Sequence, residues 1–117
     1  MEGLEKGGVL DPVQQGFIEC HGLQCGFCTP GMLMTGRALL DEHPHPTDDE
    51  IREAISGQIC RCTGYKSVIS AIHAAAEQMR TGVLPGPELA KVVTPLDNIG
   101  QPLHRPDAVE KVIGETL

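Results

Sequence analysis

The stretch QCGFCTP at residues 24–30, together with CRCTGY at residues 60–65, is the part of the chain around which the rest is organised. Four of the five cysteines stand here in two close pairs, spaced C-x2-C and C-x-C. Each pair is followed by a threonine and a helix-starting signal, Thr29-Pro30 in the first and Thr63-Gly64 in the second. The pattern predicts one arrangement used twice: two thiolates at the beginning of a helix.

Helix starts of this kind suit negatively charged sulfur. Threonine is a good N-cap, and proline in the first helical turn loses no donor that the helix needs. The amino-terminal end of a helix also carries unpaired N–H groups and a partial positive charge, which stabilise anions. Cysteines so close in sequence do not easily bond to each other, but they can present several sulfurs to one inorganic centre.

The residues alone leave several interpretations of the four thiols open: an iron–sulfur cluster, a structural zinc site, a redox-sensing dithiol pair, or two disulfides. Zinc ribbons usually repeat C-x2-C rather than ending in C-x-C, which disfavours zinc. Disulfides are disfavoured because nothing in the chain signals secretion. The fifth cysteine, Cys20, falls on one helical face with Val13 and Phe17, which predicts a buried apolar role rather than a ligand.

QCGFCTPGM followed by CRCTGY resembles the second iron–sulfur domain of the molybdenum hydroxylases, the family of xanthine dehydrogenase, aldehyde oxidoreductase and carbon monoxide dehydrogenase. The resemblance covers residues 2–79, and HGLQCGFCTPGM is most similar to the small subunits of the carbon monoxide dehydrogenase group. It implies an all-α fold, a four-helix bundle with approximate two-fold symmetry that holds a [2Fe–2S] cluster. The implied cluster ligands are Cys25, Cys28, Cys60 and Cys62.

The resemblance also implies a function and partners. Electrons would pass one at a time from a molybdopterin cofactor, through this cluster, to a second cluster in a ferredoxin-like domain and often on to an FAD subunit. The substrate (an aldehyde, a purine or other N-heterocycle, or carbon monoxide) would be oxidised at molybdenum, so the chain would have no catalytic site of its own. Gln24 and Cys62 match the positions that face the pterin in the family. Without the family, Gln24 is better explained as a residue that braces its loop.

Four helices are expected, beginning at Asp11-Pro12, Thr29, Thr47 and Thr63. Gly22 is expected to end the first, and the second to run from Thr29 to Glu42. A capping box at residues 47–50 opens the third helix, which should run to about Ser56. The fourth should be the strongest, because apolar residues recur at helical spacing over residues 65–79. Met32 and Met34 are expected to fill the core.

The bundle is predicted to occupy residues 9–80, after a glycine-rich lead-in at residues 1–8. Nine prolines and glycines from Gly82 onward predict an extended tail, with a linker at residues 81–97. Residues 98–117 resemble the opening of the molybdopterin-binding portion. The resemblance also implies a ferredoxin-like domain before the lead-in at residues 1–8, which this chain lacks. It further implies that the chain is a fragment or a separately made piece of a fused enzyme.

Length and charge limit the remaining possibilities. The chain has 117 residues and a formal net charge of −7, which argues against a nucleic-acid partner. No apolar run approaches the roughly 20 residues that span a bilayer, and no signal-peptide pattern is present, so we expect a cytoplasmic protein. A domain this small buries a limited core, and an inorganic cluster would offset that deficit.

Overall fold

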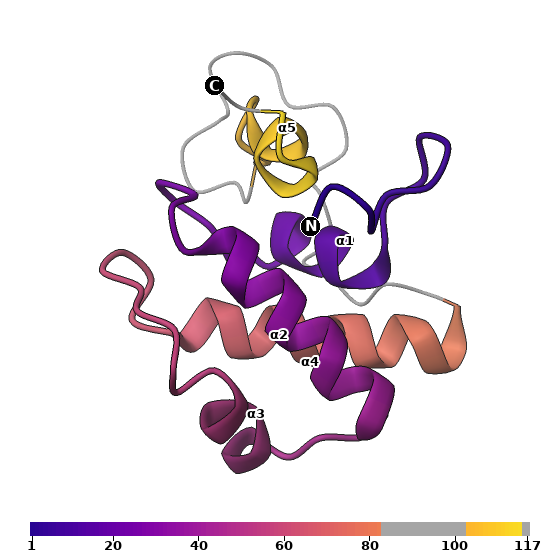
Figure 1. Ribbon diagram of the computed structural model, residues 1–117, viewed down its shortest axis with the longest axis vertical. Helices are drawn as coiled ribbons and strands as arrows, with labels where there is room; N and C mark the ends of the chain where they lie inside the picture. The colour runs from indigo at the N-terminus through magenta and orange to yellow at the C-terminus, as the bar shows by residue number, and fades with distance from the viewer. Residues whose placement is uncertain (83–102, 116–117) are drawn as a thin grey trace.

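The computed structural model describes residues 1–82 and 103–115 of the chain. These residues form five helices (Figure 1): α1 (Pro12–Glu19), α2 (Thr29–Glu42), α3 (Asp48–Ala54), α4 (Lys66–Thr81) and α5 (Ala108–Ile113). Apart from an isolated bridge between Lys6 and Val9, these two ranges contain no β-structure. The all-α class is therefore confirmed, whereas the approximate two-fold symmetry stays a prediction. Within the same ranges, no helix is long and apolar enough to cross a membrane.

Local sequence explains why α1 and α3 begin where they do. Asp11 caps α1 by accepting a hydrogen bond from the Val13 amide at 2.9 Å, and Gln14 completes a capping box by accepting one from the Asp11 amide at 2.8 Å. Thr47 caps α3 in the predicted way, since its hydroxyl accepts a hydrogen bond from the Glu50 amide at 3.2 Å. Each cap satisfies an amide that the first helical turn leaves unpaired.

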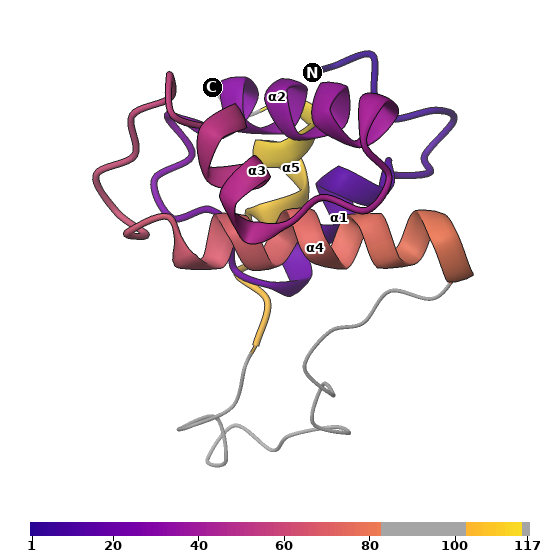
Figure 2. The same cartoon turned by 90° about the horizontal axis from the view of Figure 1, so that it is seen from below.

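The closest helix pair is α1 with α4, and a glycine makes that approach possible. A Cβ atom added to Gly16 would lie 2.5 Å from the backbone oxygen of Ala71, closer than any side chain tolerates. Figure 2 shows α2 along one side of the molecule and α4 along the other, with α1, α3 and α5 between them. The two longest helices thus enclose the core.

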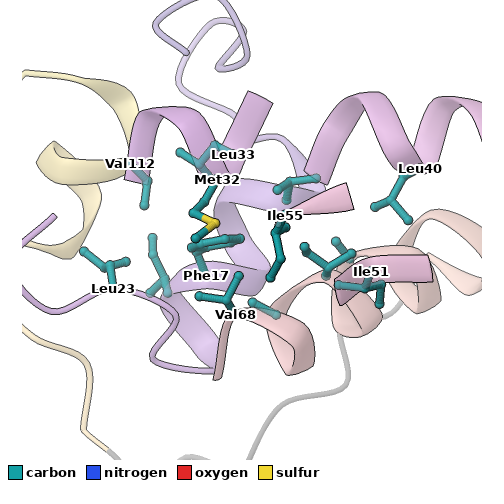
Figure 3. Close-up of a cluster of buried hydrophobic side chains, with 14 of the residues drawn as sticks. Phe17, Leu23, Met32, Leu33, Leu40, Ile51, Ile55, Val68 and Val112 are labelled. Carbon is teal, nitrogen blue, oxygen red and sulfur yellow. The ribbon is translucent and has the colours of Figure 1, made fainter. Parts of the chain in front are cut away.

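All five helices contribute to one apolar core. Phe17 and Met32 lie against each other in its middle, with Val112 of α5 towards one end and Leu40 and Ile51 towards the other (Figure 3). Completely buried apolar side chains are worth about 1.5–3 kcal/mol each relative to exposure. The fully or almost fully buried members of the core are Val13, Phe17, Met32, Leu33, Leu40, Ile51, Val68, Ala71, Ile72, Ala75 and Val112.

Helix α5 corrects the prediction of a tail that is extended throughout. Ala108 and Val112 are four residues apart, so they share one helical face, and both are buried against α1 and α2. The buried side chain of Gln14 donates a hydrogen bond to the carbonyl oxygen of Val112 at 2.9 Å, which fixes α5 to α1. Residues 83–97 of the predicted linker, and residues 98–102 of the predicted molybdopterin-binding portion, lie outside the described residues.

Smaller corrections concern helix ends and one methionine. The first helix ends at Glu19, and the residue in the left-handed conformation after it is His21, with φ of 55°, not Gly22. The third helix ends at Ala54, before the predicted Ser56. Met32 is buried as expected, but Met34 is 48% exposed. Two residues along a helix correspond to about 200° around its axis, so the two methionines cannot share a face.

Candidate metal centre

Two loops carry the four cysteines, one between α1 and α2 and the other between α3 and α4. Both loops lie on the same side of the molecule, before the starts of α2 and α4 in Figure 1. All five cysteines are free thiols, so neither C-x2-C nor C-x-C forms a disulfide. Cys25 and Cys62 are exposed, whereas Cys28 and Cys60 are partly buried.

The first loop ends directly in a helix, but its threonine is not the cap. Cys28 itself is the N-cap of α2, and Pro30 lies in the first turn as predicted. The Phe27 amide donates a hydrogen bond to Cys25 Sγ at 3.4 Å, and Gly26 adopts a left-handed conformation with φ of 86°. Thr29 is fully buried, and its hydroxyl has no hydrogen-bond partner among the described residues.

The second loop is braced by side chains instead of a direct helix start. Helix α4 begins at Lys66, three residues later than predicted, and its N-cap Tyr65 has the unusual φ of 69°. The Tyr65 hydroxyl accepts a hydrogen bond from the Cys60 amide at 3.1 Å and donates one to the Gln58 carbonyl at 3.4 Å. A non-glycine residue at positive φ is uncommon and is kept only where its surroundings hold it.

The backbone after Thr63 explains the late helix start, because Gly64 and Tyr65 have φ of 65° and 69° and a right-handed helix cannot continue through them. The Thr63 hydroxyl accepts a hydrogen bond from the Tyr65 amide at 3.1 Å and lies 3.2 Å from Cys60 Sγ. It therefore closes a short turn around the thiol rather than capping α4. The role predicted for Thr63 as the first residue of the fourth helix is wrong.

The thiols of the two loops interact across the gap between the loops. Cys25 interacts with Cys62, and Cys28 with Cys60. Burial, together with the neighbouring Cys60 thiol, raises the pKa of Cys28 to about 11. Burial also opposes ionisation of Cys60, but hydrogen bonds from Thr63 and Cys62 outweigh it and lower its pKa to about 7. The Phe27 amide, the Cys62 thiol and the Lys111 ammonium lower the pKa of Cys25.

The donor set suits a cluster of two irons. Iron–sulfur clusters are held by cysteine thiolates, and here each loop supplies one exposed and one partly buried thiol to the same place. No group of three or more His, Cys, Asp and Glu side chains among the described residues is arranged to hold a single metal ion. Four cysteine thiolates are the usual ligands of a [2Fe–2S] cluster and also of a structural zinc ion, so the donor set alone allows both.

The other residues predicted for the site lie beside these loops. Gln24 precedes Cys25 directly and is exposed, as is Cys62. Two large apolar side chains are exposed next to the ligands: Phe27 at 92% and Ile59 at 76%. Cys20 is the C-cap of α1 and packs against the core, and burial followed by the Glu19 charge raises the pKa of its thiol.

The sequence analysis missed one residue at the centre, Lys111 of α5. Its ammonium donates a hydrogen bond to the Cys25 carbonyl at 2.9 Å. The signal that could have located it is weak, because the apolar pattern at residues 108–113 is short and does not show the surface on which this segment packs. A contact between residues 86 positions apart leaves no local trace in the sequence.

A groove of about 700 Å³ lies between α3 and α4 and borders the second loop. Its walls include Tyr65 and Gln58, and His73 bonds to Asp48 at its edge. None of the cysteines lines this groove, so the candidate centre is at the exposed end of the loops and not in the hollow behind them.

Comparison with known proteins identifies the class to which this site belongs. Residues 1–73 match the family model described as a [2Fe-2S] binding domain. The chain is 49% identical over 78 residues to the nicotinate dehydrogenase small FeS subunit of Eubacterium barkeri, covering 67% of this chain and 50% of that subunit. It is 53% identical over 62 residues to the aldehyde oxidase of Homo sapiens, covering 53% of this chain and 5% of that protein.

Solved structures agree with the sequence comparison. The aldehyde oxidoreductase from Desulfovibrio gigas matches with a TM-score of 0.82 and 33% identity, over 97% of this chain and 13% of that chain. The quinoline 2-oxidoreductase from Pseudomonas putida 86 matches with a TM-score of 0.64 and 53% identity, over 69% of this chain and 51% of that chain. The chain therefore spans about half or less of the length of these relatives.

The family match covers well over half of the chain, so the chain belongs to the family of [2Fe–2S]-binding domains. The predicted cofactor, a [2Fe–2S] cluster, is thereby confirmed. The match also favours the iron–sulfur interpretation over the structural zinc module.

Proposed function

We propose that this chain transfers single electrons through a [2Fe–2S] cluster held by Cys25, Cys28, Cys60 and Cys62, as part of a molybdenum hydroxylase. The observation that carries the proposal is the meeting of four free thiols from two loops at one exposed place. When bound, the cluster supplies a group that takes up and releases one electron.

Hydrogen bonds from the protein's own residues favour the thiolate form at two of the four thiols, Cys25 and Cys60. The Phe27 amide donates to Cys25, and the Thr63 hydroxyl lies within hydrogen-bond distance of Cys60. Hydrogen bonds to sulfur stabilise thiolate and are among the factors that set the potential of an iron–sulfur centre. The unpaired amides at the start of α2, directly after Cys28, add positive potential on the same side.

A contact face for the electron donor lies around the cluster loops, and we define it as Gln24, Phe27, Ile59 and Cys62. All four are exposed, and Gln24, Phe27 and Ile59 have uncharged side chains. Neighbouring large apolar residues that are exposed, such as Phe27 and Ile59, mark interaction sites. Electron transfer needs two centres close together, so the partner should meet the chain here. The amide of Gln24 can both donate to and accept from a pterin edge.

The partners we propose are a molybdopterin-binding subunit or domain, a ferredoxin-like [2Fe–2S] domain and an FAD subunit, in the cytoplasm. Relatives in nicotinate dehydrogenase and aldehyde oxidase support this assignment. The substrate would be an aldehyde, an N-heterocycle or carbon monoxide, oxidised on the partner. The chain alone is then expected to show no turnover of any of them.

Reconstitution of the purified chain with iron and sulfide without oxygen tests the proposal. We expect a red-brown protein that contains iron and acid-labile sulfide in equal amounts, about two of each per chain. After reduction with dithionite, it should show the electron paramagnetic resonance signal of one unpaired electron. A colourless protein that takes up one zinc ion in place of iron would contradict the proposal and support the zinc module.

A further inference from the structure

Lys111 reaches from α5 to the first cysteine loop and lies along its backbone. Its Nζ atom donates a hydrogen bond to the Cys25 carbonyl at 2.9 Å. Its stem passes over Gly26 so closely that a Cβ atom added there would lie 3.0 Å from Lys111 Cδ. The lysine side chain retains 15% exposure, so it is largely withdrawn from water.

The helix that carries Lys111 is firmly attached to the bundle. Val112 and Ala108 are buried in the core, and the Val112 carbonyl accepts a hydrogen bond from the buried Gln14 side chain at 2.9 Å. Lys111 is the residue before Val112 and lies one helical turn after Ala108, so it stands at the edge of the buried face of α5. Its position over the loop is therefore set by α1 and the core, and not by the lysine alone.

The charge of Lys111 is not cancelled by a dedicated partner. The nearest carboxylate is Asp107, whose oxygen lies 3.8 Å from the ammonium. That carboxylate already accepts two hydrogen bonds from the Arg105 guanidinium, at 2.6 and 2.9 Å. Arg105, Asp107 and Lys111 together leave one net positive charge beside the loop that carries Cys25.

We propose that Lys111 is a positioning residue for the cluster, which holds the Cys25 loop and raises the reduction potential of the centre through its charge. Reduction adds one negative charge to the cluster, and a nearby cation stabilises the reduced form more than the oxidised form. The inference rests on the proposed assignment of Cys25 as a ligand. It adds that α5, through the charge of Lys111, contributes to the reduction potential of the electron-transfer site.

The test compares Lys111→Met, Lys111→Arg and Lys6→Met in the full chain after reconstitution with iron and sulfide. The potential is measured by a redox titration followed by visible absorption. We expect Lys111→Met to lower the ratio of reduced to oxidised cluster at a fixed applied potential about fivefold, which is ~40 mV at about 59 mV per tenfold for one electron. Lys111→Arg should restore most of the difference, and Lys6→Met, which removes an exposed charge in the amino-terminal loop, should change little.

A second readout separates charge from simple loosening of the loop. The rate at which a chelator removes iron should rise in Lys111→Met, while helix content measured by circular dichroism stays unchanged. If Lys111→Met binds a normal cluster at an unchanged potential, the inference is wrong and the proposed function stands. If Lys111→Met and Lys6→Met lower the potential equally, net charge alone explains the shift and the inference is also wrong. A parent chain that binds no iron–sulfur cluster would overturn both proposals.

Discussion

The loop before α2 and the loop before α4 each present two thiols, but they are braced from very different distances along the chain. In the second loop, Tyr65 and Thr63 bind the backbone and the thiol of Cys60 within five residues. In the first loop, the side-chain brace is Lys111, which lies 86 positions away from Cys25. The second loop carries its own support, whereas the first depends on a helix from the far end of the described chain.

Two similar Cys-Thr motifs therefore make different contacts, because the side chains that surround them differ. Both threonines follow a cysteine, yet Thr63 makes two polar contacts and Thr29 is buried with its hydroxyl unpaired among the described residues. In the second loop, hydrogen bonds between residues close in sequence hold the conformation of the loop. The first loop is instead coupled to the packing of α5, so its geometry responds to changes in the core.

Substitution of the proposed ligand cysteines, of which each loop carries two, should have the largest effect on cluster binding and stability. Replacing any one of Cys25, Cys28, Cys60 or Cys62 with alanine should abolish or severely weaken cluster binding, because each removes a proposed ligand. Thermal unfolding followed by circular dichroism should then show a large loss of stability, since cluster binding and folding are coupled. The matched control is Cys20→Ala, which should keep the visible spectrum. The ligand assignment would be wrong if Cys20→Ala lost the visible absorption of the cluster while a variant at one of the four proposed ligands kept it.

The brace of the second loop should respond next most strongly. Tyr65→Phe removes the hydroxyl that joins the Cys60 amide to the Gln58 carbonyl, and it should lower the free energy of unfolding by roughly 1–2 kcal/mol. Urea titration of the chain without its cluster measures this, because the cluster cannot then conceal the change. Lys111→Met is the comparison, and it should cost less in the same titration. Equal costs would mean that the two loops are not braced as differently as their contacts indicate.

The two threonines give a matched pair with a smaller expected difference. Thr63→Val removes a hydroxyl with two polar contacts and should cost about 1 kcal/mol. Thr29→Val keeps the shape while removing a buried, unpaired hydroxyl, so it should be neutral or slightly stabilising. Both values come from urea titration of the cluster-free chain. A larger loss for Thr29→Val would show that this hydroxyl has a partner that supports the first loop.

The contact face should show the smallest effect. Gln24 and Ile59 each precede the first cysteine of their loop, so Gln24→Ala and Ile59→Ala form another matched pair. In a complex with a molybdopterin-binding partner, Gln24→Ala should keep the cluster and slow its reduction by substrate several-fold, as one lost amide hydrogen bond of roughly 0.5–1.5 kcal/mol implies. Ile59→Ala should weaken binding of the partner instead. The contact face would lie elsewhere if charge reversal at Asp48 and Asp49 disrupted assembly with the partner while Gln24→Ala had no effect.

The helices and thiols were predictable because their signals are local. Asp11-Pro12, Thr29-Pro30 and the capping box at Thr47 each mark a helix start within a few residues, and two of the three threonine or aspartate caps predicted there form. The pairing of C-x2-C with C-x-C likewise marks the four thiols without any knowledge of the fold. Such patterns carry their physical reason within one turn of chain.

The remaining features depend on contacts that the sequence does not display. The fourth helix begins later than expected because Gly64 and Tyr65 both have positive φ, and the pattern Thr-Gly does not reveal this for Tyr65. The place of α5 depends on how its apolar face meets α1 and α2, and Lys111 inherits its position from that packing. Contacts made in the folded chain, and not helix propensity, decide where α4 begins and where Lys111 lies.

The hydrogen bond between Gln14 and Val112 also orders the assembly of the protein in time. The two residues are 98 positions apart, so during synthesis the Gln14 amide group exists long before its acceptor leaves the ribosome. Helix α1 can pack against α4 earlier, and the Gln14 oxygen can already accept from the Asp11 amide, but the Gln14 NH₂ group has no Val112 acceptor until α5 arrives. Docking of α5 is then the step that pairs the buried NH₂ group of Gln14, and a nascent chain paused before residue 112 would lack the part of the core that Val112 fills.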